Sequence, residues 1–60
     1  MLANLNLHRG VRETYRQAMV QRMTQQAAFD RAVQLILEQE PEADPRRARR
    51  FVALMVANEP

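Results

Sequence analysis

Four arginines within five consecutive residues are the side chains in this sequence that are best suited to bind another molecule. They are Arg46, Arg47, Arg49 and Arg50. A guanidinium group presents its N–H donors in a planar fork that fits carboxylate and phosphate oxygens. The cluster therefore predicts contact with an anion, which could belong to the same chain, to another protein or to nucleic acid.

Acidic residues of the same chain are the first candidate for that anion. Four of them lie just before the arginines, namely Glu38, Glu40, Glu42 and Asp44. Residues 32–44 contain these acids and no base, whereas residues 1–31 contain five arginines against two acids. Charge runs of this kind are commonly solvated or paired locally. The sequence leaves open whether the arginines pair with these acids or bind an external anion.

Nucleic acid is the second candidate. Arg9, Arg12 and Arg16 share one side of a helix and could extend the basic surface. Short three-helix units that place their last helix in the major groove are known. Against this, the net charge is only +2, the region before the arginines is acidic, and neither Asn nor Gln adjoins residues 46–50 to read bases. A nucleic-acid-binding regulator that uses the arginine face is therefore the alternative function.

No arrangement of side chains indicates catalysis. His8 is the only histidine and there is no cysteine, so no His or Cys set has the spacing of zinc ligands. Glu38 and Glu40 are two residues apart and do not share a helical face. Catalytic triads, glycine-rich phosphate loops and H-E-x-x-H motifs are absent from the sequence. We expect a protein that is not an enzyme and that uses no cofactor or metal.

The arginines belong to a predicted helix over residues 45–57. Asp44 is a suitable N-cap, and Pro45 suits the first helical position because its missing N–H is not needed there. At 100° per residue, the arginines fall on one side with Leu54 as the single apolar residue among them. The other side is apolar and is formed by Ala48, Phe51, Val52, Met55 and Val56.

Residues 11–40 contain neither glycine nor proline and are rich in helix formers. An apolar stripe of Val11, Tyr15, Ala18 and Met19 recurs eighteen residues later, which is about five turns of helix. This phase match favours one long or gently kinked helix over residues 11–40, antiparallel to 45–57. The alternative is a break at residues 24–26 with Thr24 as N-cap, which gives a monomeric three-helix bundle.

The long-helix interpretation leaves an apolar stripe that the short helix cannot cover. It predicts a helical hairpin that forms a homodimer or binds a protein partner through Val11, Tyr15, Met19 and Met23. A domain of this size is marginally stable alone and has no disulfide, which also favours association. The leading functional hypothesis is therefore a non-enzymatic protein–protein interaction or regulatory module.

Sixty residues are enough for one small helical domain, 1–60, with residues 1–6 as an N-terminal arm. Asn4 or Asn6 is expected to cap the first helix, which Gly10 would weaken. No apolar run is long enough to span a membrane, and no secretory signal is apparent, so a cytoplasmic location is expected. The sequence does not identify the partner.

Overall fold

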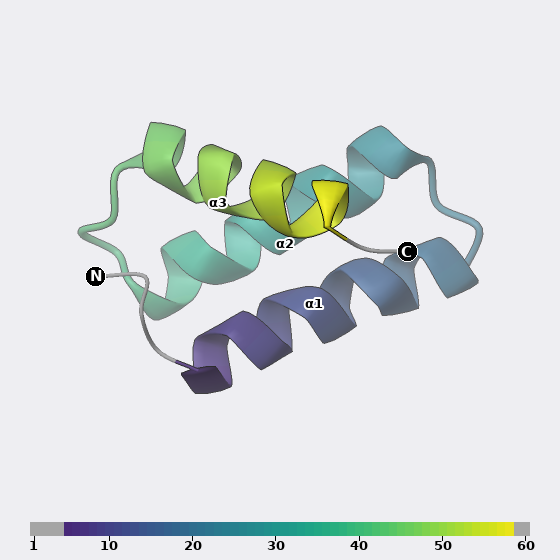
Figure 1. The fold of residues 1–60 in the computed structure, drawn as a ribbon, viewed down its shortest axis with the longest axis horizontal. Coiled ribbons are helices and arrows are strands. Elements are labelled where there is room, and N and C mark those ends of the chain that lie inside the picture. Colours follow the sequence, from purple (N-terminus) through teal and green to yellow (C-terminus); the bar gives the residue numbers. More distant parts are fainter. Residues whose placement is uncertain (1–4, 59–60) are drawn as a thin grey trace.

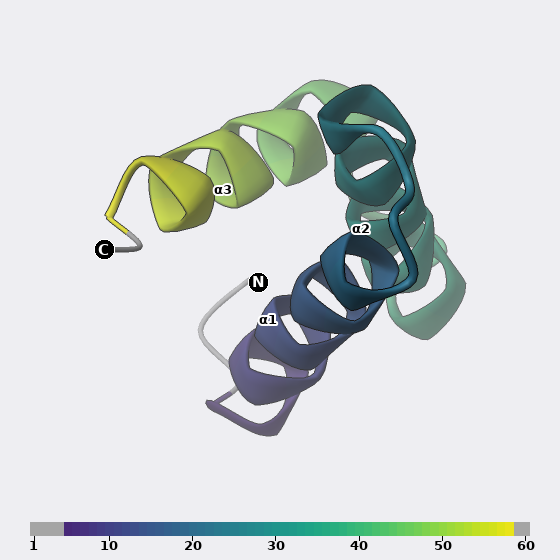
Figure 2. The same cartoon turned by 90° about the vertical axis from the view of Figure 1, so that its right-hand side faces the viewer.

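The part of the chain that the structure describes folds into three helices arranged around the middle one. The computed structural model describes residues 5–58, in which α1 spans Leu5–Val20, α2 spans Gln25–Gln39 and α3 spans Pro45–Ala57. α1 and α2 form an antiparallel pair, and α3 packs on α2 (Figure 1). The view in Figure 2 shows α1 and α3 diverging from α2. The predicted all-α class is confirmed.

Residues 21–24 interrupt the long helix that the apolar phase favoured. The Met23 N–H donates to the Ala18 carbonyl at 3.1 Å, and the Arg22 N–H donates to the Met19 carbonyl at 3.0 Å. These two bonds form a Schellman motif, which satisfies carbonyls at the end of α1. Arg22 has φ 64°, in the left-handed region. The prediction of one helix over residues 11–40 is therefore wrong, and the break into three helices that the alternative predicted is confirmed.

Thr24 begins α2 as the three-helix alternative required. It has an extended backbone, and its hydroxyl oxygen accepts a hydrogen bond from the Ala27 N–H at 3.1 Å. This bond satisfies one of the free N–H groups in the first turn of α2. The two apolar stripes therefore share a phase without sharing a helix, and most of their residues pack in or against the same core.

The connection between α2 and α3 follows the signals in its sequence. Glu40 closes α2 by donating its N–H to the Ile36 carbonyl at 2.8 Å, and Pro41 follows outside the helix. The Asp44 carboxylate accepts the Arg46 N–H at 2.9 Å, and Pro45 is the first residue of α3. The predicted bounds of the last helix, 45–57, are confirmed.

The core forms where the three helices meet. Val11 of α1, Ile36 of α2 and Val52 of α3 are fully buried within it. Val11 was predicted to contact a partner, but its side chain is enclosed within a single chain. Because α2 folds back along α1, it covers the stripe that the shorter α3 alone could not cover. The uncovered stripe that motivated the dimer prediction is therefore largely absent.

The start of α1 also differs from its expected form. Leu5 and Asn6 are already helical, although residues 1–6 were predicted to be an arm, and Asn6 is therefore not the N-cap. Asn4 lies outside the described residues. Gly10 is inside α1, and a Cβ built there would lie 3.8 Å from Leu35 Cδ2, which is ordinary van der Waals contact.

Candidate binding surface on the last helix

The outer face of α3 joins the predicted arginine cluster to exposed apolar side chains. We define this face by its six exposed residues, which are Arg46, Arg47, Arg50, Ala53, Leu54 and Ala57. The opposite side of α3 is buried through Ala48, Val52 and Met55. The helical period thus separates a packing side from a solvent side, and Leu54 is exposed among the arginines, as predicted.

The arginines of the outer face form no ion pair with any carboxylate among residues 5–58. The acids of the α2–α3 connection are close in sequence but do not reach them. The Asp44 carboxylate accepts the backbone N–H of Arg46 instead, as the N-cap. Pairing within the chain, which the sequence left open, is therefore not formed, and these guanidinium groups face solvent beside the N-terminus of α3, where positive charge is disfavoured by the helix dipole.

Arg49 differs from the other three arginines because it lies against α2. Its guanidinium carbon is 5.7 Å from the centre of the Phe29 ring, which is cation–π geometry. Arg49 and Phe29 line an open pocket together with Gln25 and Gln26 at the start of α2. Arg49 therefore contributes to the packing of α3 on α2 and is less free to contact a partner.

The C-terminal half of the outer face is apolar. Ala53, Leu54 and Ala57 are exposed there, and 60% of the Leu54 surface is accessible. A solvated helix face normally carries polar or charged residues. The two alanines add little bulk around Leu54, so another helix could approach this half of α3 closely.

Of the predicted interface residues other than Val11, two are half-buried and one is exposed. Tyr15 is half-buried and packs against the core, and Met23 is half-buried within the α1–α2 connection. Met19 is 43% exposed and adjoins Val20, which is 70% exposed. The end of α1 therefore presents a second exposed apolar area, on a different helix from the outer face of α3.

The basic residues of α1 lie on a different helix from the α3 cluster. Arg9, Arg12 and Arg16 are exposed, and the Arg16 guanidinium is 3.7 Å from the Glu13 carboxylate. These residues point away from the core, as the predicted helical spacing requires. Because α1 and α3 diverge from α2 (Figure 2), the two basic groups stand on separate arms of the fold.

His8 has a packing role that the sequence did not indicate. Its ring centre lies 5.3 Å from that of Phe51 at an interplanar angle of 86°, an edge-to-face contact between α1 and α3. Sequence spacing could not identify this pair, because the two residues are 43 positions apart and on helices that meet only after folding. The contact helps to hold α3 in place and so positions its outer face.

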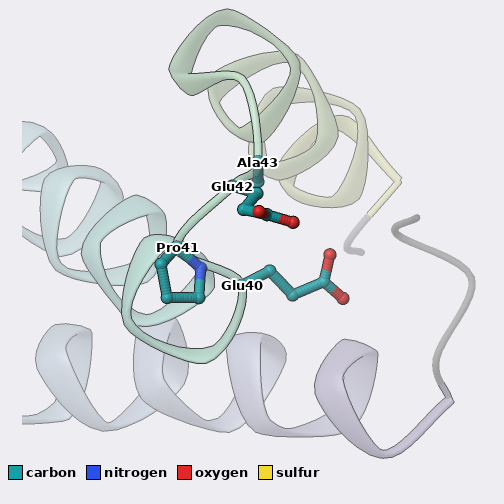
Figure 3. Close-up of a pocket in the computed structure, with 4 residues that line it drawn as sticks. All are labelled: Glu40, Pro41, Glu42 and Ala43. Carbon is teal, nitrogen blue, oxygen red and sulfur yellow. The ribbon is translucent and has the colours of Figure 1, made fainter.

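The α2–α3 connection forms an open acidic pocket next to the start of α3. Glu40, Pro41, Glu42 and Ala43 line it, and both glutamate side chains project to the same side (Figure 3). Over residues 5–58, no group of three His, Cys, Asp or Glu side chains is placed to hold a metal ion. The pocket therefore adds negative charge near the arginines and provides no metal-binding set.

No described helix is both long and apolar enough to cross a membrane. Comparisons with protein-family models, curated proteins and solved structures found no match for this chain. The functional argument therefore depends on the chemistry of the α3 outer face.

Proposed function

We propose that this protein is a non-enzymatic interaction module that binds another protein through the outer face of α3. One observation carries the proposal: arginines that have no carboxylate partner within residues 5–58 and an exposed apolar half occupy the same helix face. Arginine is enriched in protein interfaces, where apolar side chains form the desolvated centre. Burial of Leu54 and pairing of the arginines would satisfy both halves of this face.

A protein partner accounts for the outer face better than nucleic acid does. Phosphate groups would pair with Arg47 and Arg50 but would leave Leu54 and its neighbouring alanines in water. A protein surface can place carboxylates opposite the arginines and apolar side chains opposite Leu54.

Photocrosslinking in the cells that make the protein would test this proposal. The probe is the variant Leu54→p-benzoyl-phenylalanine, and the matched control carries the same group at exposed Gln34 on α2, away from α3. We expect protein adducts from position 54 that are absent from position 34. The adducts should disappear when Arg47→Glu and Arg50→Glu are added, because these changes place like charges opposite the partner.

The other outcomes would contradict the proposal. Adducts that nuclease removes would assign the face to nucleic acid, which is the alternative function. Equal labelling from positions 54 and 34 would mean that the contact is not specific to this face, and no adduct would mean that nothing docks on it. Circular dichroism of the purified variants should show unchanged helix content, because all the altered side chains are exposed.

A further inference from the structure

The two halves of the α3 outer face restrict the shape of its partner. Arg47, Arg50 and Leu54 are at positions i, i+3 and i+7 and form one row along the helix. This row spans about 10 Å of the helix axis, roughly half the length of the thirteen-residue α3. The row is straight and has small residues at its apolar end. Such a row is the surface that a second helix packs against, with axes about 8–10 Å apart.

The charge of the face restricts the chemistry of that helix. The first half is filled by three arginines that pair with no carboxylate of residues 5–58. The second half has no charged or polar side chain before Asn58. A complementary helix has carboxylates over one half and apolar side chains over the other. A partner helix with only carboxylates or only apolar side chains would match one half of the outer face and leave the other half without a complementary surface.

A second copy of this chain does not offer such a helix within residues 5–58. The exposed side of α1 is basic, with Met19 and Val20 at its end. The exposed side of α2 includes Asp30, Gln34 and Glu38 but no large exposed apolar residue. α3 would meet its own arginines. The acidic and apolar features that the face requires therefore do not occur together on any described helix of this chain.

We propose that the outer face of α3 docks an acidic amphipathic helix of a different protein. Carboxylates of that helix lie opposite Arg46, Arg47 and Arg50, and its apolar side chains cover Leu54 between Ala53 and Ala57. This inference rests on the proposed function, since it specifies the partner of the same face. It goes further by naming the secondary structure, the charge and the non-identity of the partner.

Fluorescence anisotropy with defined peptides would test the inference on the full chain. The probe is a labelled, hydrocarbon-stapled helix with glutamates along one half and leucines and alanines along the other. Its control is the same peptide with every glutamate replaced by arginine. Because the direction of docking is open, both peptides are made with the charged half first and with it last. We expect one acidic peptide to bind at least about tenfold more tightly than its control, since like charges at an interface are strongly disfavoured.

Variants of the chain would show whether binding uses the predicted face. Arg47→Glu with Arg50→Glu should weaken binding of the acidic peptide at least about tenfold, and Leu54→Gln should weaken it severalfold. Arg16→Glu with Arg31→Glu makes the same change in net charge on α1 and α2, and should alter the affinity by less than about twofold because exposed charges at a distance are screened.

The inference would be overturned if acidic and basic peptides bound alike, if neither bound, or if the α1 and α2 variant weakened binding as much as the α3 variant. It would also be overturned if the chain formed a dimer that Leu54→Gln dissociated, or if position 54 crosslinked two copies of the chain. In those cases the proposed interaction function would still stand. That function itself fails only if the crosslinks in cells are to nucleic acid, are not specific to position 54, or do not form.

Discussion

The two connections of this protein reverse the chain by different means. The α2–α3 connection has Pro41 after its last helical turn, Asp44 as N-cap and Pro45 as first helical residue. The α1–α2 connection depends on Arg22 in the left-handed region, where glycine is usual, and on Thr24 as N-cap. The α2–α3 connection is favoured by its own residues. The α1–α2 connection includes Arg22, whose left-handed backbone conformation is energetically disfavoured for a residue with a side chain.

This difference shows how a strained turn can persist. A non-glycine residue in the left-handed region costs roughly 1–2 kcal/mol. The core contacts that form when α2 folds back along α1 must offset that energy, and Val11 and Ile36 are fully buried as a result. Tertiary packing therefore helps to hold the α1–α2 connection, while the α2–α3 connection is favoured by its own proline and capping residues.

Proline at position 22 should be the most damaging change to either connection. Arg22→Pro imposes a φ near −65° where the backbone has 64°, and it removes the N–H that donates to Met19. We expect a loss of about 3 kcal/mol or more in the free energy of unfolding, measured by urea denaturation with circular dichroism. Arg22→Ala, which keeps the N–H, should be much closer to wild type. Equal stability of all three proteins would disprove the left-handed turn.

Glycine at the same position should have the opposite effect. Arg22→Gly removes the steric penalty of the left-handed conformation, and some of this gain is cancelled by the greater freedom of glycine in the unfolded chain. The expected result is a net stabilisation of about 1 kcal/mol, or a rise of about 4–8 °C in melting temperature for a domain of this size. A lower melting temperature would show that Arg22 contributes contacts that outweigh its strain.

The two N-caps should contribute similarly despite the difference between the connections. Thr24→Ala and Asp44→Ala each remove one side-chain acceptor, at 3.1 Å and 2.9 Å from its N–H. Each substitution should lower the free energy of unfolding by about 1 kcal/mol. Thr24→Ser and Asp44→Asn keep an acceptor and should retain most of the stability. An unchanged denaturation midpoint for either alanine variant would mean that its capping bond is not important.

The smallest effect is expected from removing the proline that follows α2. Pro41→Ala leaves the folded connection intact but gives the unfolded chain more conformations, so a loss of about 0.4–1 kcal/mol is expected. Stability would then fall when proline is removed from the α2–α3 connection at position 41, and fall when proline is added to the α1–α2 connection at position 22. A loss as large as that of Arg22→Pro would show that Pro41 makes contacts in the folded chain beyond its effect on chain entropy.

The sequence predicted the last helix in detail and misjudged the region before it. For α3, the N-cap, the proline, the end of the helix and the exposure of Leu54 all follow from residues within a few positions of one another. For residues 11–40, the absence of glycine and proline and the match in apolar phase both favoured a continuous helix. The local signals for a break were weak: Thr24 can be an N-cap, but threonine also occurs inside helices.

The candidate site divides in the same way. The sequence alone determined the all-helical class, the bounds of α3 and the presence of arginines on one side of it, because capping and helical periodicity act over short distances. Only the tertiary structure decided that Val11 is covered within one chain, that Arg49 lies over Phe29 and that the outer arginines have no carboxylate partner within residues 5–58. These features depend on the angles at which helices meet. Those angles are set by the packing of side chains that are distant in sequence.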